Sequence, residues 1–79
     1  MASSTEITLQ EIFRAVLNMP PGTDVTKVRQ LGHPKWDSLA HVSLIAALES
    51  EFGVEVDVAQ SLDLTSYESV LLYLKEHGK

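Results

Sequence analysis

Apolar residues near the start of the chain recur with the spacing of one helical face. The pattern predicts a helix whose buried stripe is Leu9, Ile12, Phe13, Val16 and Leu17. Thr8, with Glu11 three residues later, forms a capping-box pattern that favours a start there, and an alternative start lies nearer Ser4. The helix is expected to end before Met19, because two prolines follow and the residue before a proline is pushed out of helical geometry.

A long connection that contains prolines and glycines follows, from Pro20 to Trp36. Val25, Val28 and Leu31 are spaced three residues apart within it, which is the spacing of a tight helical turn. We expect these apolar side chains to form such a turn and to hold the connection against the core, so that the loop is ordered.

The second helical pattern runs from Leu39 to Phe52 and closes at Gly53, a residue suited to a left-handed C-terminal cap. Residues 54–58 then alternate apolar and polar, as a strand would. Because the chain has no second strand-like segment to pair with them, we expect an extended link into a short helix near Ala59–Leu62. The expected buried stripe of the second helix is Leu39, Val42, Ile45, Ala46, Leu48 and Phe52.

A last helix is indicated by the capping-box pattern of Thr65 and Glu68 and by the stripe of Tyr67, Val70, Leu71 and Leu74, and Gly78 closes it. The sequence therefore predicts an all-α bundle of three main helices and one short helix, with a long first loop. We expect a single domain over residues 1–79, with frayed ends at 1–5 and 77–79. The expected core is Leu9, Ile12, Phe13, Val16, Leu17, Leu39, Val42, Ile45, Leu48, Phe52, Val56, Val70, Leu71 and Leu74.

The chain has 79 residues, and a chain of this size buries only about 60% of the surface that it exposes when unfolded. Such a domain has little room for the water-excluding cleft of an enzyme. It contains no cysteine, so its own residues form neither a disulfide nor a thiolate site. Its apolar runs are too short to span a membrane and no signal-peptide pattern opens the chain, so the cytoplasm is the expected location.

The formal net charge is −5, and the acidic residues gather in the second half of the chain. No Lys or Arg occurs from Trp36 to Leu74, whereas this segment contains Asp37, Glu49, Glu51, Glu55, Asp57, Asp63 and Glu68. This distribution disfavours nucleic acid, because the carboxylates repel phosphates, and it favours basic protein partners. A solvated acidic surface that only aids solubility is the alternative.

Four polar or reactive residues lie close together in the sequence: His33, Asp37, Ser38 and His41. On a helix that begins at Ser38, His41 lies one turn further on, within reach of the serine hydroxyl. A serine hydrolase also needs an acid behind the histidine, an oxyanion hole and a shielded cleft, none of which the sequence indicates. The histidines are scattered and lack a third ligand at helical spacing, so neither a metal site nor a catalytic residue is expected. The alternative is that Asp37 or Ser38 only caps the helix.

The segment LGHPKWDSLAHVSLIAALESEFGVEV resembles the acyl carrier protein family. Asp37, Ser38 and Leu39 match the family's Asp-Ser-Leu motif, and Leu31–Gly32 resembles its preceding Leu-Gly. Residues 49–53 match the Glu-x-Glu-Phe-Gly end of its second helix, and the likeness continues to the last helix. The tripeptide alone is common, but its place at a helix start, one helix before Glu-Phe-Gly, makes the match specific.

The resemblance implies that Ser38 receives 4′-phosphopantetheine from coenzyme A, through a phosphodiester that a separate, magnesium-dependent phosphopantetheinyl transferase installs. The chain would be a substrate and shuttle rather than an enzyme, and would carry an acyl chain as a thioester in fatty-acid, polyketide or related specialised biosynthesis. Its other expected partners are acyl-loading and acyl-transfer or condensing enzymes, and it is expected to be a monomer. The alternatives are a carrier of aminoacyl or peptidyl groups and an unmodified helical interaction module.

By the same resemblance, the transferase and the partner enzymes would read the attachment motif, Asp37 and Leu39, together with exposed residues around it. In carriers of the fatty-acid type, acidic residues often occupy the places of Ala40 and Ser43, so this chain departs from that type. For Trp36 the alternative is that it packs the loop against the helix. The candidate partner-recognition residues are Trp36, Ala40, His41, Ser43, Leu44, Glu49, Glu51 and Glu55.

Overall fold

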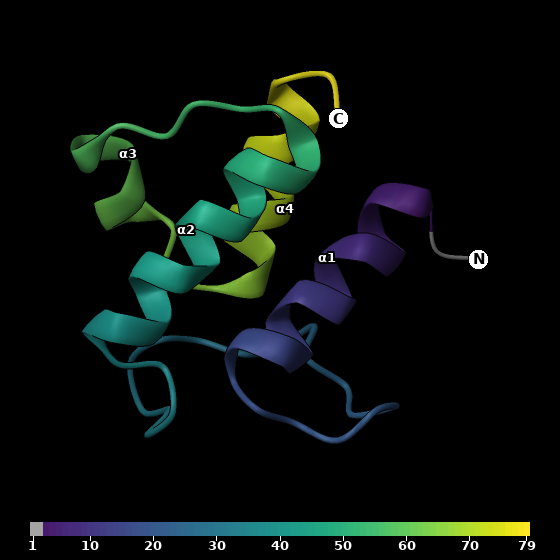
Figure 1. Cartoon of the computed structure of the whole chain (residues 1–79), viewed down its shortest axis with the longest axis vertical. Helices are drawn as coiled ribbons and strands as arrows, with labels where there is room; N and C mark the ends of the chain where they lie inside the picture. The colour runs from purple at the N-terminus through teal and green to yellow at the C-terminus, as the bar shows by residue number, and fades with distance from the viewer. Residues whose placement is uncertain (1–2) are drawn as a thin grey trace.

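Four helices form the fold of the computed structural model, which describes residues 3–79: α1 (Ser4–Val16), α2 (Ser38–Phe52), α3 (Val58–Asp63) and α4 (Tyr67–Glu76). In Figure 1, α2 crosses the molecule between α1 and the short α3, and the long connection between α1 and α2 runs along one end. The prediction of an all-α bundle with three main helices, one short helix and a long first loop is confirmed. Within residues 3–79, no helix combines the length and the apolar character that crossing a membrane requires.

Helix α1 begins earlier than its strongest sequence signal indicated. The Ser3 side chain caps it by accepting a hydrogen bond from the amide of Glu6. The start at the Thr8–Glu11 pattern is therefore wrong, and the alternative start near Ser4 is correct. Helix α4 is likewise capped one residue later than predicted, by a box of Ser66 and Ser69.

Fraying of residues 1–5 and 77–79 stays a prediction, and of these residues 1–2 lie outside the described part, whereas the others make defined contacts. Thr5 is helical, and its hydroxyl donates a hydrogen bond to the carbonyl of Lys79 at 2.6 Å. The ring of His77 lies against Tyr73 and places Nδ1 2.8 Å from the Tyr73 carbonyl oxygen. These contacts link the first turn of α1 to Lys79 and hold His77 against α4.

The buried core draws on every part of the chain except α3. The predicted positions in α1 and α4 are largely confirmed, whereas several buried residues were missed, notably Trp36, Leu44 and Tyr73. Residues expected in the core but only partly buried are Val16, Ile45, Phe52, Val56 and Leu71. The buried set is Leu9, Ile12, Phe13, Leu17, Val25, Trp36, Leu44, Leu48, Val54, Leu64, Tyr67, Val70, Tyr73 and Leu74.

The orientation of α2 differs from the prediction. Leu39 and Val42 were expected in the core, but they are 75% and 66% exposed. Leu44 and Leu48, one turn apart, face the interior instead and are 1% and 0% exposed. Because apolar residues lie around nearly the whole circumference of this helix, its spacing fits several buried faces, and only packing against the other helices selects one.

The long first loop is ordered, as predicted, although one of its expected anchors is wrong. Val25 is fully buried, and its carbonyl accepts a hydrogen bond from the amide of Val28 at 3.2 Å, which closes a single turn. Leu31 is 93% exposed and anchors nothing. Two backbone hydrogen bonds instead hold the loop to the start of α4. The Val28 carbonyl accepts from the amide of Tyr67, and the Thr65 carbonyl accepts from the amide of Gln30.

Both tyrosines of the chain are buried, and burial raises the pKa of each phenol above its ordinary value of 10.0. Because the fold favours the neutral phenol, this contribution to stability is complete below the unfolded pKa of about 10 and is lost as pH rises through the folded pKa. We expect phenolate absorbance to titrate at a higher pH in the native protein than in urea. We also expect the free energy of unfolding to decrease as pH rises above about 10. Coincident titrations in the two states would contradict this assignment.

Candidate functional site

Ser38 is the first residue of α2, and its side chain is exposed. Asp37 precedes it as the N-terminal cap, with Oδ1 accepting from the amide of Ala40 at 2.8 Å. The amide of His41 bonds to the Asp37 carbonyl at 2.9 Å. Asp37 therefore does the capping, and the interpretation of Ser38 as a cap is wrong. The Ser38 hydroxyl is left on the surface, where a second molecule can reach it.

The backbone around Ser38 favours an anion. The first amides of a helix have no intrahelical acceptor, and the helix dipole places partial positive charge at this end. Asp37 accepts hydrogen bonds from the amides of Ala40 and His41. Within residues 3–79, no acceptor is found for the amides of Ser38 and Leu39. A phosphate ester on Ser38 would lie beside these two N–H groups. The position thus fits the phosphodiester expected from the sequence.

His41 does not bond to the Ser38 hydroxyl. Its Nδ1 accepts a hydrogen bond from Trp36 Nε1 at 3.1 Å, and its Nε2 lies 2.8 Å from the carbonyl oxygen of Ser61. Because an indole N–H can only donate, Nδ1 is unprotonated and the proton resides on Nε2, which donates to Ser61. His33 is also engaged locally, since its Nδ1 accepts from the amide of Lys35 at 3.3 Å. Neither histidine is placed as a general base for Ser38.

Trp36 was a candidate for partner recognition, and the structure corrects this. Its side chain is 2% exposed and makes an edge-to-face contact with Phe13, with ring centroids 5.3 Å apart and planes at 78°. The alternative, that Trp36 packs the loop against the helices, is therefore correct. Its burial fixes the segment that leads directly into Asp37 and Ser38.

The orientation of α2 also corrects the candidate recognition surface. Leu44 is buried and does not present its side chain to a partner, whereas Ala40 is partly buried against the core and stays a candidate. Leu39 and Ser43 are exposed, and Val42, which was assigned to the core, joins them. Glu49 is exposed, but its Oε2 already accepts from the amide of Val56 at 3.0 Å. Glu51 and Glu55 are exposed, and His41 is half-buried.

A groove of about 260 Å³ lies between α2 and α3, beginning one turn from Ser38. Val42 on α2 and Val58 on α3 both line the groove and are exposed, and Leu62 of α3 is a further exposed apolar residue. The residues that line the groove are His41, Val42, Ile45, Ala46, Glu49, Val56, Asp57, Val58 and Ser61.

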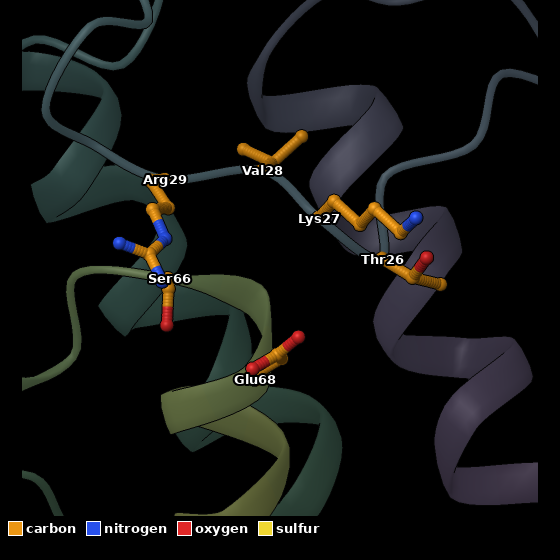
Figure 2. Close-up of a pocket in the computed structure, with 6 residues that line it drawn as sticks. All are labelled: Thr26, Lys27, Val28, Arg29, Ser66 and Glu68. Carbon is orange, nitrogen blue, oxygen red and sulfur yellow. The ribbon is translucent and has the colours of Figure 1, made fainter.

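A second hollow, of about 230 Å³, lies where the first loop meets the start of α4. Figure 2 shows the Arg29 side chain extending from the loop toward Ser66, with Glu68 on α4 and Lys27 on the same loop as Arg29. Because both signs of charge line it, this hollow offers no consistent match to an ionic ligand. Within residues 3–79, no group of three or more potential metal ligands is found.

Comparison with models of protein families identifies a family for this chain. The family model described as "Phosphopantetheine attachment site" matches residues 8–74, which is more than half of the chain and includes all of α2, α3 and the Asp37–Ser38 pair. The comparison with curated proteins found no match.

Proposed function

We propose that this chain, which belongs to the phosphopantetheine attachment-site family, carries acyl groups as thioesters on an arm bound to Ser38. Membership in the family implies a covalently attached 4′-phosphopantetheine and the transferase and biosynthetic enzymes that act on it. The arm supplies the thiol that a chain without cysteine lacks. The acyl cargo and Ser38 as the attachment point are our proposals.

The observation that carries the assignment to Ser38 is its position after a cap that is already complete. Asp37 holds the start of α2, so esterification of the neighbouring hydroxyl costs the helix no cap. The exposed hydroxyl is accessible to a transferase, and the amides of Ser38 and Leu39 support the added phosphate. Modification therefore requires no rearrangement of the fold.

The groove between α2 and α3 supports an acyl cargo over an aminoacyl or peptidyl one. Val42, Ile45 and Val56 give it an apolar surface, and it begins one turn from Ser38. A hydrocarbon chain gains free energy by leaving water for such a surface, whereas a charged aminoacyl group does not. Positions 40 and 43 are Ala and Ser rather than acidic residues, which supports a role in a specialised pathway over one in housekeeping fatty-acid synthesis.

The exposed side of α2 and α3 supports a docking role. Leu39 and Val42 on α2 and Val58 and Leu62 on α3 are exposed apolar residues, and Glu51, Glu55, Asp57 and Asp63 are exposed in the same stretch of chain. We infer that the transferase and the acyl-transfer or condensing enzymes bind here through basic and apolar groups, weakly and with strong dependence on salt. The chain itself acts as substrate and shuttle without catalysis, as a cytoplasmic monomer of one domain.

Incubation with coenzyme A, Mg²⁺ and a broad-specificity phosphopantetheinyl transferase tests the proposal. Intact-mass measurement is expected to show the addition of one phosphopantetheine group per chain. A chain that keeps its original mass, under conditions that modify a known carrier in the same tube, would favour the unmodified interaction module instead.

A further inference from the structure

Trp36, His41 and Ser61 form a hydrogen-bonded relay across the attachment end of the molecule. Trp36 donates to His41, and His41 donates to the main-chain oxygen of Ser61 in α3. The rings of Trp36 and His41 also stack, with centroids 6.1 Å apart and planes at 27°. Because the acceptor in α3 is a carbonyl, this end of the relay depends on the backbone position of α3 and not on the Ser61 hydroxyl.

The two ends of the relay differ in how firmly they are held. Trp36 is buried against Phe13 of α1, and it immediately precedes Asp37 and Ser38. In α3, by contrast, no residue is buried. The relay therefore connects a rigid anchor beside the attachment serine to the most loosely packed helix of the bundle.

Helix α3 is fastened to α2 by one side chain near each end of the groove. His41 bonds to Ser61 near the end of α3, and Glu49 accepts from the amide of Val56 just before α3 begins. Buried Val54 and Leu64 flank the segment and act as its fixed points. Between these points the groove is lined by both helices, so α3 forms one wall of it.

We propose that His41 is a positioning residue that fastens α3 over the groove and ties it to the Trp36 anchor beside Ser38. Breaking the bond between His41 and Ser61 frees the α3 wall to move away from α2. The part of this proposal that concerns cargo rests on the proposed function: a chain carried on Ser38 enters the groove when this bond opens. The part that concerns α3 is a property of the unmodified protein.

Two substitutions separate the two halves of the relay. His41→Asn places an acceptor near the Nδ1 position and keeps the Trp36 bond, but it does not reach Ser61. His41→Gln places a donor near the Nε2 position and keeps the Ser61 bond, but it loses the Trp36 acceptor. Ser61→Ala controls for the serine side chain, because it removes the hydroxyl's bond to the Val58 carbonyl but leaves the carbonyl acceptor for His41 in place.

Amide hydrogen exchange of the unmodified variants is the decisive measurement. In His41→Asn, the amides of Ser61 and Leu64 are expected to exchange roughly two- to thirteenfold faster, as loss of one such bond implies, while the Val70 amide in α4 stays near its wild-type rate. His41→Gln is expected to protect α3 nearly as well as wild type while changing the emission of Trp36, the one tryptophan of the chain. Unchanged α3 exchange in His41→Asn, or equal acceleration in α3 and α4, would overturn the proposal.

The loaded protein tests the link to cargo. After attachment of an octanoyl-phosphopantetheine arm, His41→Asn is expected to protect its thioester from hydroxylamine several-fold better than wild type, because the groove opens more readily. Equal cleavage rates would overturn the gating role of His41. A chain that cannot be loaded but shows selective α3 exchange would retain the relay and refute the carrier proposal, so the two failures are distinguishable.

Discussion

Replacing Ser38 by alanine is expected to abolish modification by a phosphopantetheinyl transferase. The transferred phosphate needs the Ser38 oxygen as its acceptor, and alanine has no atom that can replace it. The expected effect is a complete loss of the mass gain rather than a slower reaction. Intact-mass measurement over a time course with excess transferase and coenzyme A distinguishes these two results.

A matched control comes from the same helix. Ser43 is also exposed on α2, so Ser43→Ala removes a hydroxyl from the same surface and is expected to leave the extent of modification unchanged. The free energy of unfolding of both variants should lie within about 0.5 kcal/mol of the wild-type value, because each changes an exposed side chain while Asp37 continues to cap α2. A mass gain that survives Ser38→Ala would show that the arm is attached elsewhere.

Leu44→Ala is expected to destabilise the fold by roughly 2–5 kcal/mol, the range for removing a buried leucine side chain. Leu44 is 1% exposed and faces the core between α2 and its neighbours. A domain of this size has a total stability of only about 5–15 kcal/mol, so the loss is a large part of it. Urea denaturation followed by helical circular dichroism measures the change.

Leu39→Ala provides the matched comparison, since it makes the same chemical change on the same helix at an exposed position. Its effect on the free energy of unfolding should stay within about 0.5 kcal/mol. The same variant should slow modification if partners read the apolar surface beside Ser38. If the two variants lost similar stability, or if Leu39→Ala lost more, the orientation of α2 described above would be wrong.

The existence and type of the helices could be predicted from the sequence, and the orientation of α2 could not. Helix α1 has a narrow apolar stripe, so its buried residues follow from periodicity alone. In α2, apolar residues surround the helix, so Leu39 and Leu44 are equally acceptable core residues until α1 and α4 are packed against it. The alternating segment after Gly53 was correctly interpreted as a link, because a strand without a partner leaves its backbone groups unsatisfied.

Part of the candidate site could be predicted from the sequence, and part depends on tertiary packing. Asp37 and Ser38 lie at a helix start that local sequence signals identify, and the structure places them there. The relay through His41 was missed, because its acceptor belongs to α3, twenty residues away in the sequence. The signal that was present is the pair of Trp36 and His41 on either side of the helix start, close enough in the sequence to stack once α2 forms. Their burial and bonding depend on tertiary packing.

The attachment of the arm to Ser38 can be measured directly. Trypsin cleaves after Lys35 and Lys75 and releases residues 36–75 as one peptide, which contains Ser38 and five further serines. Fragmentation of this peptide from the modified protein locates the added group. We expect the phosphopantetheine group on Ser38 alone, and its presence on another serine, or its absence from the peptide, would contradict Ser38 as the attachment point.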